Sequence, residues 1–194
     1  TTVYRGSKRH AMASAVFWQP GLREMYLGLG GVDAGRKTFD RMLTEGHSMF
    51  VLPGGEHEQM ISRYEEENLY LKSRKGFVRM AVRHGAALVP IYCFGESALY
   101  YTSDFLLGLR TFLVTKFRIG IPMVYSGRGL LPMKRKLAFV VGPPIRVADP
   151  KYTVIDREEE RVDIILQDYI SEIQRIFDEY KDRFGYGHHP LTVH

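Results

Sequence analysis

The sequence predicts an α/β fold, a three-layer sandwich with a largely parallel sheet. Three short apolar runs predict strands at residues 48–52, 87–94 and 137–141. Segments with helical spacing separate these runs, and strands that alternate with helices are typical of parallel sheets. A chain of 194 residues is long enough for one hydrophobic core, so we expect residues 1–194 to form a single domain.

Proline and glycine mark the ends of the helical segments. A proline at position 20 suits a first helical turn, and glycines at 30, 46 and 85 are placed to end helices. The predicted helices span residues 19–29, 35–45, 76–85 and 157–184. The last helix has an apolar stripe that predicts core packing, made of Val162, Ile165, Leu166, Tyr169, Ile173, Ile176, Phe177 and Tyr180.

Composition excludes some classes of protein. The net charge is +5, which suits nucleic acid, an anionic membrane surface or a phosphorylated ligand. The basic residues are scattered and form no nucleic-acid-binding motif, so we expect no nucleic-acid partner. No apolar run approaches the ~18–20 residues of a membrane-spanning helix. Cys93, the only cysteine, lies in an apolar run and is expected to be a small core residue in a reducing compartment.

Residues 48–97 form a strand, a Gly-Gly turn, a polar loop at 61–71, a helix and a second strand. In open α/β sheets ligands bind outside the carboxyl ends of strands, where this stretch gathers its polar groups. The amides of Gly54 and Gly55 could converge on an oxyanion, or the pair could be a plain tight turn. Glu58 could hydrogen-bond an acceptor hydroxyl, or be a solvated carboxylate. Gly95 and Glu96 form the polar exit of strand 87–94.

Three cations, Lys72, Arg74 and Lys75, precede the helix that starts near Gly76. Cations at a helix start oppose the macrodipole and cost local stability, whereas a phosphate there would be stabilised. We therefore expect a phosphate site, the alternative being a solvated basic turn.

Residues 104–125 predict an amphipathic helix rich in Leu and Phe with basic flanks. Such a helix can lie in a membrane interface, or it can be an ordinary helix that faces the core.

The motifs of the central stretch resemble the type 2 diacylglycerol acyltransferase family, which includes monoacylglycerol and wax-alcohol acyltransferases. The matching residues are Gly54-Gly55-x-x-Glu58, Arg74-Lys75-Gly76-Phe77, His84-Gly85-Ala86-x-Leu88-Val89-Pro90 and Phe94-Gly95-Glu96. The resemblance implies a glycerolipid-acyltransferase-like fold, with acyl-CoA as co-substrate and no cofactor or metal. It implies transfer of the acyl group to diacylglycerol or a related neutral lipid, at the cytosolic face of the endoplasmic reticulum membrane and on lipid droplets.

The same resemblance assigns the site residues. Glu58 is expected to be catalytic, and substrate binding is expected from Gly54, Gly55, Arg74, Lys75, Gly76, Gly95 and Glu96. The expected partners are acyl-CoA, the neutral-lipid acceptor and a membrane surface, and a homo-oligomer is also among the expectations.

One catalytic part does not match. Acyl transfer needs a general base, and relatives carry His-Pro-His-Gly or, in phospholipid acyltransferases, H-x-x-x-x-D. None of the seven histidines lies in either motif, and the chain starts at Thr1. We therefore expect the carboxyl-terminal part of an acyltransferase, without the family's membrane hairpin and histidine motif. The alternatives are a diverged inactive copy, a glycerol-phosphate acyltransferase and a non-catalytic module that binds lipid at a membrane surface.

Overall fold

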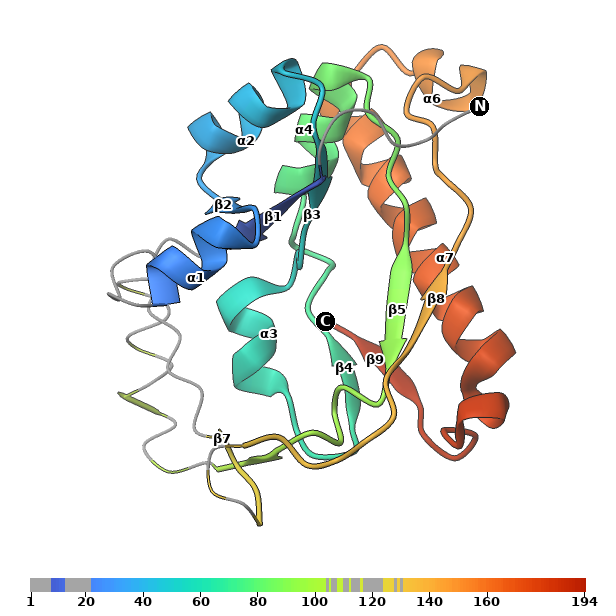
Figure 1. Cartoon of the computed structure of the whole chain (residues 1–194). Coiled ribbons are helices and arrows are strands. Elements are labelled where there is room, and N and C mark those ends of the chain that lie inside the picture. Colours follow the sequence, from blue (N-terminus) through green and yellow to red (C-terminus); the bar gives the residue numbers. More distant parts are fainter. Residues whose placement is uncertain are drawn as a thin grey trace.

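A computed structural model describes residues 8–12, 22–103, 105, 108, 109, 112, 116, 124–127, 129 and 131–194. The helices of the described part are α1 (Leu22–Gly28), α2 (Arg36–Thr44), α3 (Gly55–Ile61), α4 (Gly76–His84), α6 (Pro150–Thr153) and α7 (Glu158–Phe184) (Figure 1). The strands are β1 (Lys8–Met12), β2 (Gly31–Asp33), β3 (Ser48–Phe50), β4 (Glu67–Leu69), β5 (Ile91–Phe94), β6 (Tyr101–Thr102), β7 (Val124–Tyr125), β8 (Ala138–Val141) and β9 (Leu191–Val193). Over the described residues, every helix is too short or too polar to cross a bilayer.

The described strands form four small sheets. Strand β1 lies between β2 and β3 and is parallel to both, and β4 is parallel to β9. Strand β5 is antiparallel to β8, and β6 is antiparallel to β7. The predicted strands at 48–52, 87–94 and 137–141 correspond to β3, β5 and β8, each shorter than predicted. One three-layer sandwich with a largely parallel sheet stays a prediction.

The apolar run at 137–141 predicts a buried strand, and this prediction of burial was wrong. Phe139 is 62% exposed and Val141 57% exposed, while the alternate residues Ala138 and Val140 pack inward. The β5–β8 pair therefore buries one face against α7 and leaves the other face of β8 open. Alternation of burial with a period of two is the ordinary pattern of a strand with one covered face.

The prediction of an exposed loop at 61–71 was also wrong. Residues 67–69 form β4, whose pairing with β9 brings together segments far apart in the sequence. Glu67, in a run of three glutamates, is only 7% exposed. The predicted turn at 54–58 is likewise the start of helix α3.

Helix α7 contributes side chains to both hydrophobic clusters of the core, and Figure 1 shows it running alongside β5 and β8. Its 27 residues begin at three acidic residues that complement the helix macrodipole, and they end at Gly185 in the left-handed conformation. Its stripe packs into two hydrophobic clusters, one with α4 and one with β5, as the sequence predicts.

Two of the predicted helices, at 19–29 and 104–125, lie partly outside the described residues. Helix α1 starts at Leu22, and residues 19–21 lie outside the described residues. Most of the amphipathic segment 104–125 lies outside them too. Of that segment, Phe105, Leu109 and Phe112 are exposed, and Val124–Tyr125 forms strand β7 rather than helix.

Candidate functional site

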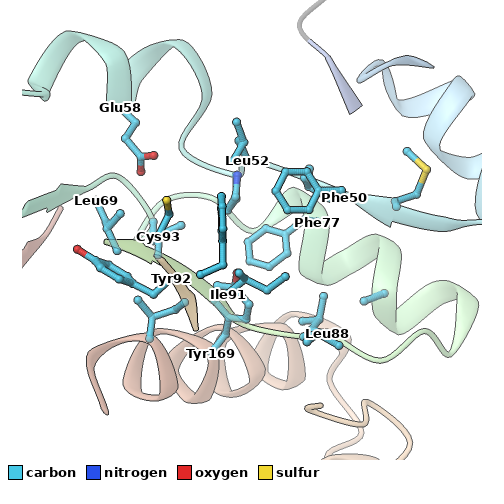
Figure 2. A pocket seen from close by; sticks show the side chains of 18 of the residues that line it. Phe50, Leu52, Glu58, Leu69, Phe77, Leu88, Ile91, Tyr92, Cys93 and Tyr169 are labelled. Carbon is cyan, nitrogen blue, oxygen red and sulfur yellow. The ribbon is translucent and has the colours of Figure 1, made fainter. Parts of the chain in front are cut away.

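A cavity of about 1210 Å³ lies among α2, α3, α4, β3, β4, β5 and α7. Its walls are largely apolar, and Figure 2 shows Phe50, Leu52, Leu69, Phe77, Leu88 and Ile91 around it (Figure 2). Clefts for small ligands are usually ~300–1,000 Å³ and mostly apolar with a few polar groups. This cavity, hereafter the cavity, therefore has the size and the lining for a long apolar molecule.

Glu58 is the carboxyl group that α3 brings to the cavity. Figure 2 shows its side chain extending from α3 toward the space above β5. One carboxylate oxygen, Oε2, accepts a hydrogen bond of 2.8 Å from the backbone N–H of Tyr70. Burial is the largest influence and raises the pKa of Glu58; the Tyr70 N–H and Arg74 lower it, and the charge of Glu96 raises it. A carboxyl with a raised pKa is better matched to proton transfer near neutral pH than an ordinary one.

The structure brings Arg74 to the Gly-Gly segment. Its Nε donates to the carbonyl oxygen of Pro53 at 2.7 Å, and its Nη2 donates to that of Gly54 at 2.8 Å. Gly55 has φ +59°, and a Cβ there would lie 2.6 Å from Arg74 Nη2. Gly54 packs against the side chain of Glu58. Thus four predicted site residues, Gly54, Gly55, Glu58 and Arg74, are neighbours, and of these Glu58 lines the cavity.

Lys75 and Gly76 lie apart from the cavity lining. Lys75 forms an ion pair with Asp163 of α7, and Gly76 opens α4 with no other atom near the place of a Cβ. Since Arg74 and Lys75 both have partners within the chain, their binding of phosphate stays a prediction.

Gly95 and Glu96 take different roles after β5. Gly95 has φ +97°, and a Cβ there would collide with the carbonyl oxygen of Lys136. Only glycine fits this crossing of two backbone segments. Glu96 is exposed on part of its surface and lines the cavity; desolvation of its carboxyl, followed by the charge of Glu67, raises its pKa.

A buried polar cluster was missed by the sequence analysis. The Glu67 carboxylate accepts hydrogen bonds from the phenol of Tyr92 and, at 2.6 Å, from the hydroxyl of Ser97. All three residues line the cavity. Burial is the largest cause of a raised Tyr92 pKa, followed by Glu67. In the sequence, Glu67 stands in a charged run that looks solvated, so only its pairing with β9 reveals its burial.

Tyr169 was predicted as core and also lines the cavity. Its ring packs edge-on against Phe77, with ring centroids 5.1 Å apart. Burial first, and then the charge of Glu58, raise the pKa of Tyr169 to about 12. Helix α7 therefore contributes a protonated phenol to the wall that carries Glu58.

The remaining candidates are accounted for by their contacts. Cys93 is half-buried in the cavity wall, and burial chiefly raises its pKa to about 11, so the thiol stays protonated at neutral pH. His84 Nε2 lies 3.0 Å from Asp40 Oδ1, and the ring of His57 stacks on that of Tyr70. In the part of the chain that the structure describes, no group of three His, Cys, Asp or Glu side chains could hold a metal ion.

Comparisons with known proteins show which sequences this chain is similar to. The family model described as diacylglycerol acyltransferase matches residues 2–193. A mouse protein named diacylglycerol O-acyltransferase 2-like protein 6 is 34% identical, over 90% of this chain and 56% of its own. Human acyl-CoA wax alcohol acyltransferase 2 is 34% identical over 88% of this chain and 54% of its own, and human diacylglycerol O-acyltransferase 2 is 34% identical over 87% and 46%.

These relatives are longer than the chain. It spans about half the length of the curated relatives it matches. No solved structure matches it.

Proposed function

The chain belongs to the diacylglycerol acyltransferase family, and from this premise we propose that it forms the part of an acyl-CoA-dependent O-acyltransferase that binds the substrates. We propose that it also supplies Glu58 as the base, in place of the histidine motif that the sequence lacks. In the proposed reaction the hydroxyl oxygen of a neutral lipid attacks the thioester carbonyl of acyl-CoA. The new C–O bond gives an ester, the C–S bond breaks, and the hydroxyl proton passes by way of a base to the leaving thiolate. Diacylglycerol is the proposed acceptor, which makes the product triacylglycerol.

The observation that carries the proposal is a carboxyl with a raised pKa on the wall of a large apolar cavity. The cavity can receive the fatty acyl chain, since each buried methylene contributes ~0.8 kcal/mol to binding. Glu58 can then hydrogen-bond the acceptor hydroxyl and withdraw its proton. The Gly54-Gly55 segment is proposed to line the same site.

The charge of the polar wall favours an uncharged acceptor. Glu58, Glu67 and Glu96 all line the cavity, and their mutual repulsion contributes to the raised pKa values of Glu58 and Glu96. A phosphate group would add further negative charge to that wall. This argues against the glycerol-phosphate acyltransferase considered above.

We also propose that the protein works on a membrane surface, at the cytosolic face of the endoplasmic reticulum and on lipid droplets. Acyl-CoA and neutral lipids are amphiphilic or apolar, and the exposed side chains of Phe105, Leu109 and Phe112 offer apolar contacts. We also propose that the protein forms a homo-oligomer. Measurement of its oligomeric state in detergent tests this.

A non-catalytic lipid-binding module is the second candidate. The observation that favours it is that none of the seven histidines lies in His-Pro-His-Gly or H-x-x-x-x-D. Such a module would bind lipid or acyl-CoA in the cavity without turnover.

Membranes from cells that lack neutral-lipid acyltransferases, supplied with labelled oleoyl-CoA, separate these candidates. With diacylglycerol we expect labelled triacylglycerol, and Glu58→Gln should lower kcat by about 10²–10⁴-fold, the usual contribution of a general base. Prolonged labelling of Cys93 by a maleimide, which is slow because the thiol is protonated, measures binding separately. Oleoyl-CoA should protect this thiol, because Cys93 lies in the cavity wall. Protection without product indicates the lipid-binding module, and product only from a glycerol-phosphate acceptor indicates the other branch.

A further inference from the structure

Two of the five N–H donors of Arg74 are hydrogen-bonded to the backbone. Its two hydrogen bonds, of 2.7 and 2.8 Å, go to consecutive carbonyl oxygens, those of Pro53 and Gly54. The planar guanidinium presents its donors in a fixed fork, which suits two acceptors held side by side. Each carbonyl is thereby fixed in direction, because the peptide unit is planar.

The same guanidinium reaches the neighbours of the Gly-Gly segment. Its central carbon lies 5.7 Å from the ring centroid of Tyr70, whose backbone N–H holds the Glu58 carboxylate. The Tyr70 ring also stacks on His57, one residue before Glu58, with ring centroids 5.2 Å apart. Arg74 therefore contacts both the start of α3 and the segment that binds the carboxylate of α3.

The sequence predicts that Arg74 belongs to a phosphate site, which for acyl-CoA would bind the phosphates of coenzyme A. Its Nη2, however, lies so close to Gly55 that a Cβ at that position would be 2.6 Å away. A guanidinium that packs on backbone at this distance and donates to two carbonyls from its Nε and Nη2 is held against the Pro53–Gly55 segment.

We infer that Arg74 is a positioning residue, which holds the Pro53–Gly55 segment and, through Tyr70, the Glu58 carboxyl in place at the cavity. The inference rests on the proposed function, since it concerns how Glu58 is presented to an acceptor hydroxyl. Small displacements of a positioned group can cost about a hundredfold in rate. The contribution of Arg74 therefore belongs to kcat, whereas a phosphate ligand would contribute to the KM for acyl-CoA.

Arg74 also acts on Glu58 through charge. The groups that bear on Glu58 are Arg74, the Tyr70 N–H, Glu96 after β5 and Tyr169 of α7, and Arg74 is the cation among them. Without Arg74 the pKa of Glu58 should rise further, because burial and the charge of Glu96 raise it and Arg74 lowers it. The acidic limb of the pH–rate profile should therefore move to higher pH.

The test compares Arg74→Ala and Arg74→Lys with Arg79→Ala. Arg79 is a matched control because it is also a forked arginine, bonded to Glu159 at 2.8 and 2.7 Å on the outer side of α4. For R74A we expect kcat to fall by about 10–100-fold with the KM for oleoyl-CoA changed less than twofold. R74K should restore the pH midpoint, because it keeps the charge, but not kcat, because it lacks the fork.

Amide hydrogen exchange tests the geometry apart from turnover. R74A should speed exchange of the Tyr70 amide, which donates to the Glu58 carboxylate, by about tenfold, and R79A should leave it unchanged. Unchanged exchange in R74A, or a raised KM with an unchanged kcat, would overturn the inference. If the wild-type protein makes no product, the proposed function fails while hydrogen exchange still decides the positioning. Should R74A not fold, R74K gives the same comparison.

Discussion

The phenol of Tyr92 donates a hydrogen bond to the buried carboxylate of Glu67 and so ties two separate sheets together. Glu67 begins β4, which pairs with β9, and Tyr92 lies in β5, which pairs with β8. No ladder of backbone hydrogen bonds joins the two pairs in the described part of the chain. The side-chain hydrogen bond therefore links the two strand pairs at the wall of the cavity, where no backbone ladder of the described residues joins them.

Tyr92→Phe should lower the free energy of unfolding by about 1.5–3 kcal/mol, the range for a hydrogen bond to a charged group. The variant keeps the ring that packs on Phe94 and Phe177 and leaves Glu67 with Ser97 as its one remaining donor. Urea unfolding measures the change. Tyr64→Phe is the control, because the Tyr64 hydroxyl accepts an exposed bond from Arg135, and it should change stability by less than ~0.5 kcal/mol. Equal effects of the two variants would contradict a structural role for the Tyr92–Glu67 bond.

Glu58 should make stability depend on pH with a definite sign. Its pKa is raised in the folded protein, so the folded state binds the proton more tightly than the unfolded state. The stabilisation that this proton provides is complete below the ordinary glutamate pKa of ~4.3 and is lost as the pH rises through the raised pKa. Relative to Glu58→Gln, which cannot ionise, the wild type should therefore lose stability across that interval. A difference that stays constant with pH would show that Glu58 has an ordinary pKa.

Two glycines from one predicted site should respond in opposite ways to alanine. Gly95→Ala should destabilise by about 1–3 kcal/mol, because φ is +97° and the new Cβ meets the Lys136 carbonyl. Gly76→Ala should stabilise by roughly 0.5–1 kcal/mol, since Gly76 opens α4 with free space around it. Thermal melting of both variants is the measurement. A neutral Gly95→Ala would mean that the two backbone segments can move apart at little cost.

Filling the mouth of the cavity should change the preferred acyl chain. Leu52 lines the cavity and is exposed, so Leu52→Trp adds bulk where a long chain would enter. We expect kcat/KM for oleoyl-CoA to fall by about tenfold relative to octanoyl-CoA. Leu131→Trp, at an exposed leucine away from the cavity lining, is the control. An unchanged ratio would place the acyl chain somewhere else.

Lys72 and Lys75 are the cations of the predicted phosphate site that remain beside Arg74, and of these two, in the described part of the chain, Lys75 is the one held by an ion pair. Lys75→Ala should raise the KM for acyl-CoA by about fivefold, the effect of ~1 kcal/mol of a charge-assisted contact. Asp163→Asn should lower this KM, because Asp163 is the partner that now holds Lys75. With acyl-pantetheine, which lacks the nucleotide phosphates, neither variant should differ from wild type. A difference that persists with acyl-pantetheine would rule out phosphate as the group that Lys75 binds.

Local sequence signals located most of the helices. Helix α7 has a long apolar stripe and a terminal glycine, and α4 ends at Gly85 with φ +62°, so both are recognisable from spacing alone. The pairing of strands could not be predicted in the same way, because the sequence of β5 or β8 does not indicate which strand is its partner. The antiparallel β5–β8 pair and the β4–β9 pair are decided by packing against α7, which is a property of the whole chain.

The sequence named several residues that lie close together in the fold, but it did not predict the contacts among them. The motif residues Gly54, Glu58 and Arg74 lie next to one another, and their roles stay predictions. That Arg74 faces carbonyl oxygens depends on the direction of one side chain, which spacing cannot reveal. Glu67 and Tyr169 were missed for a similar reason, since a charged run and a core stripe look the same whether or not a cavity lies beside them.

The parallel pairing of β4 with β9 has a consequence for the order of folding. It joins residues 67–69 to residues 191–193, and closing so large a loop is entropically costly, so such non-local contacts form late. Until they form, Glu67 is not yet buried, and the apolar lining of the cavity is open to neighbouring molecules. The apolar cavity that is proposed to receive an acyl chain is therefore also a surface through which the incompletely folded chain can aggregate or bind chaperones.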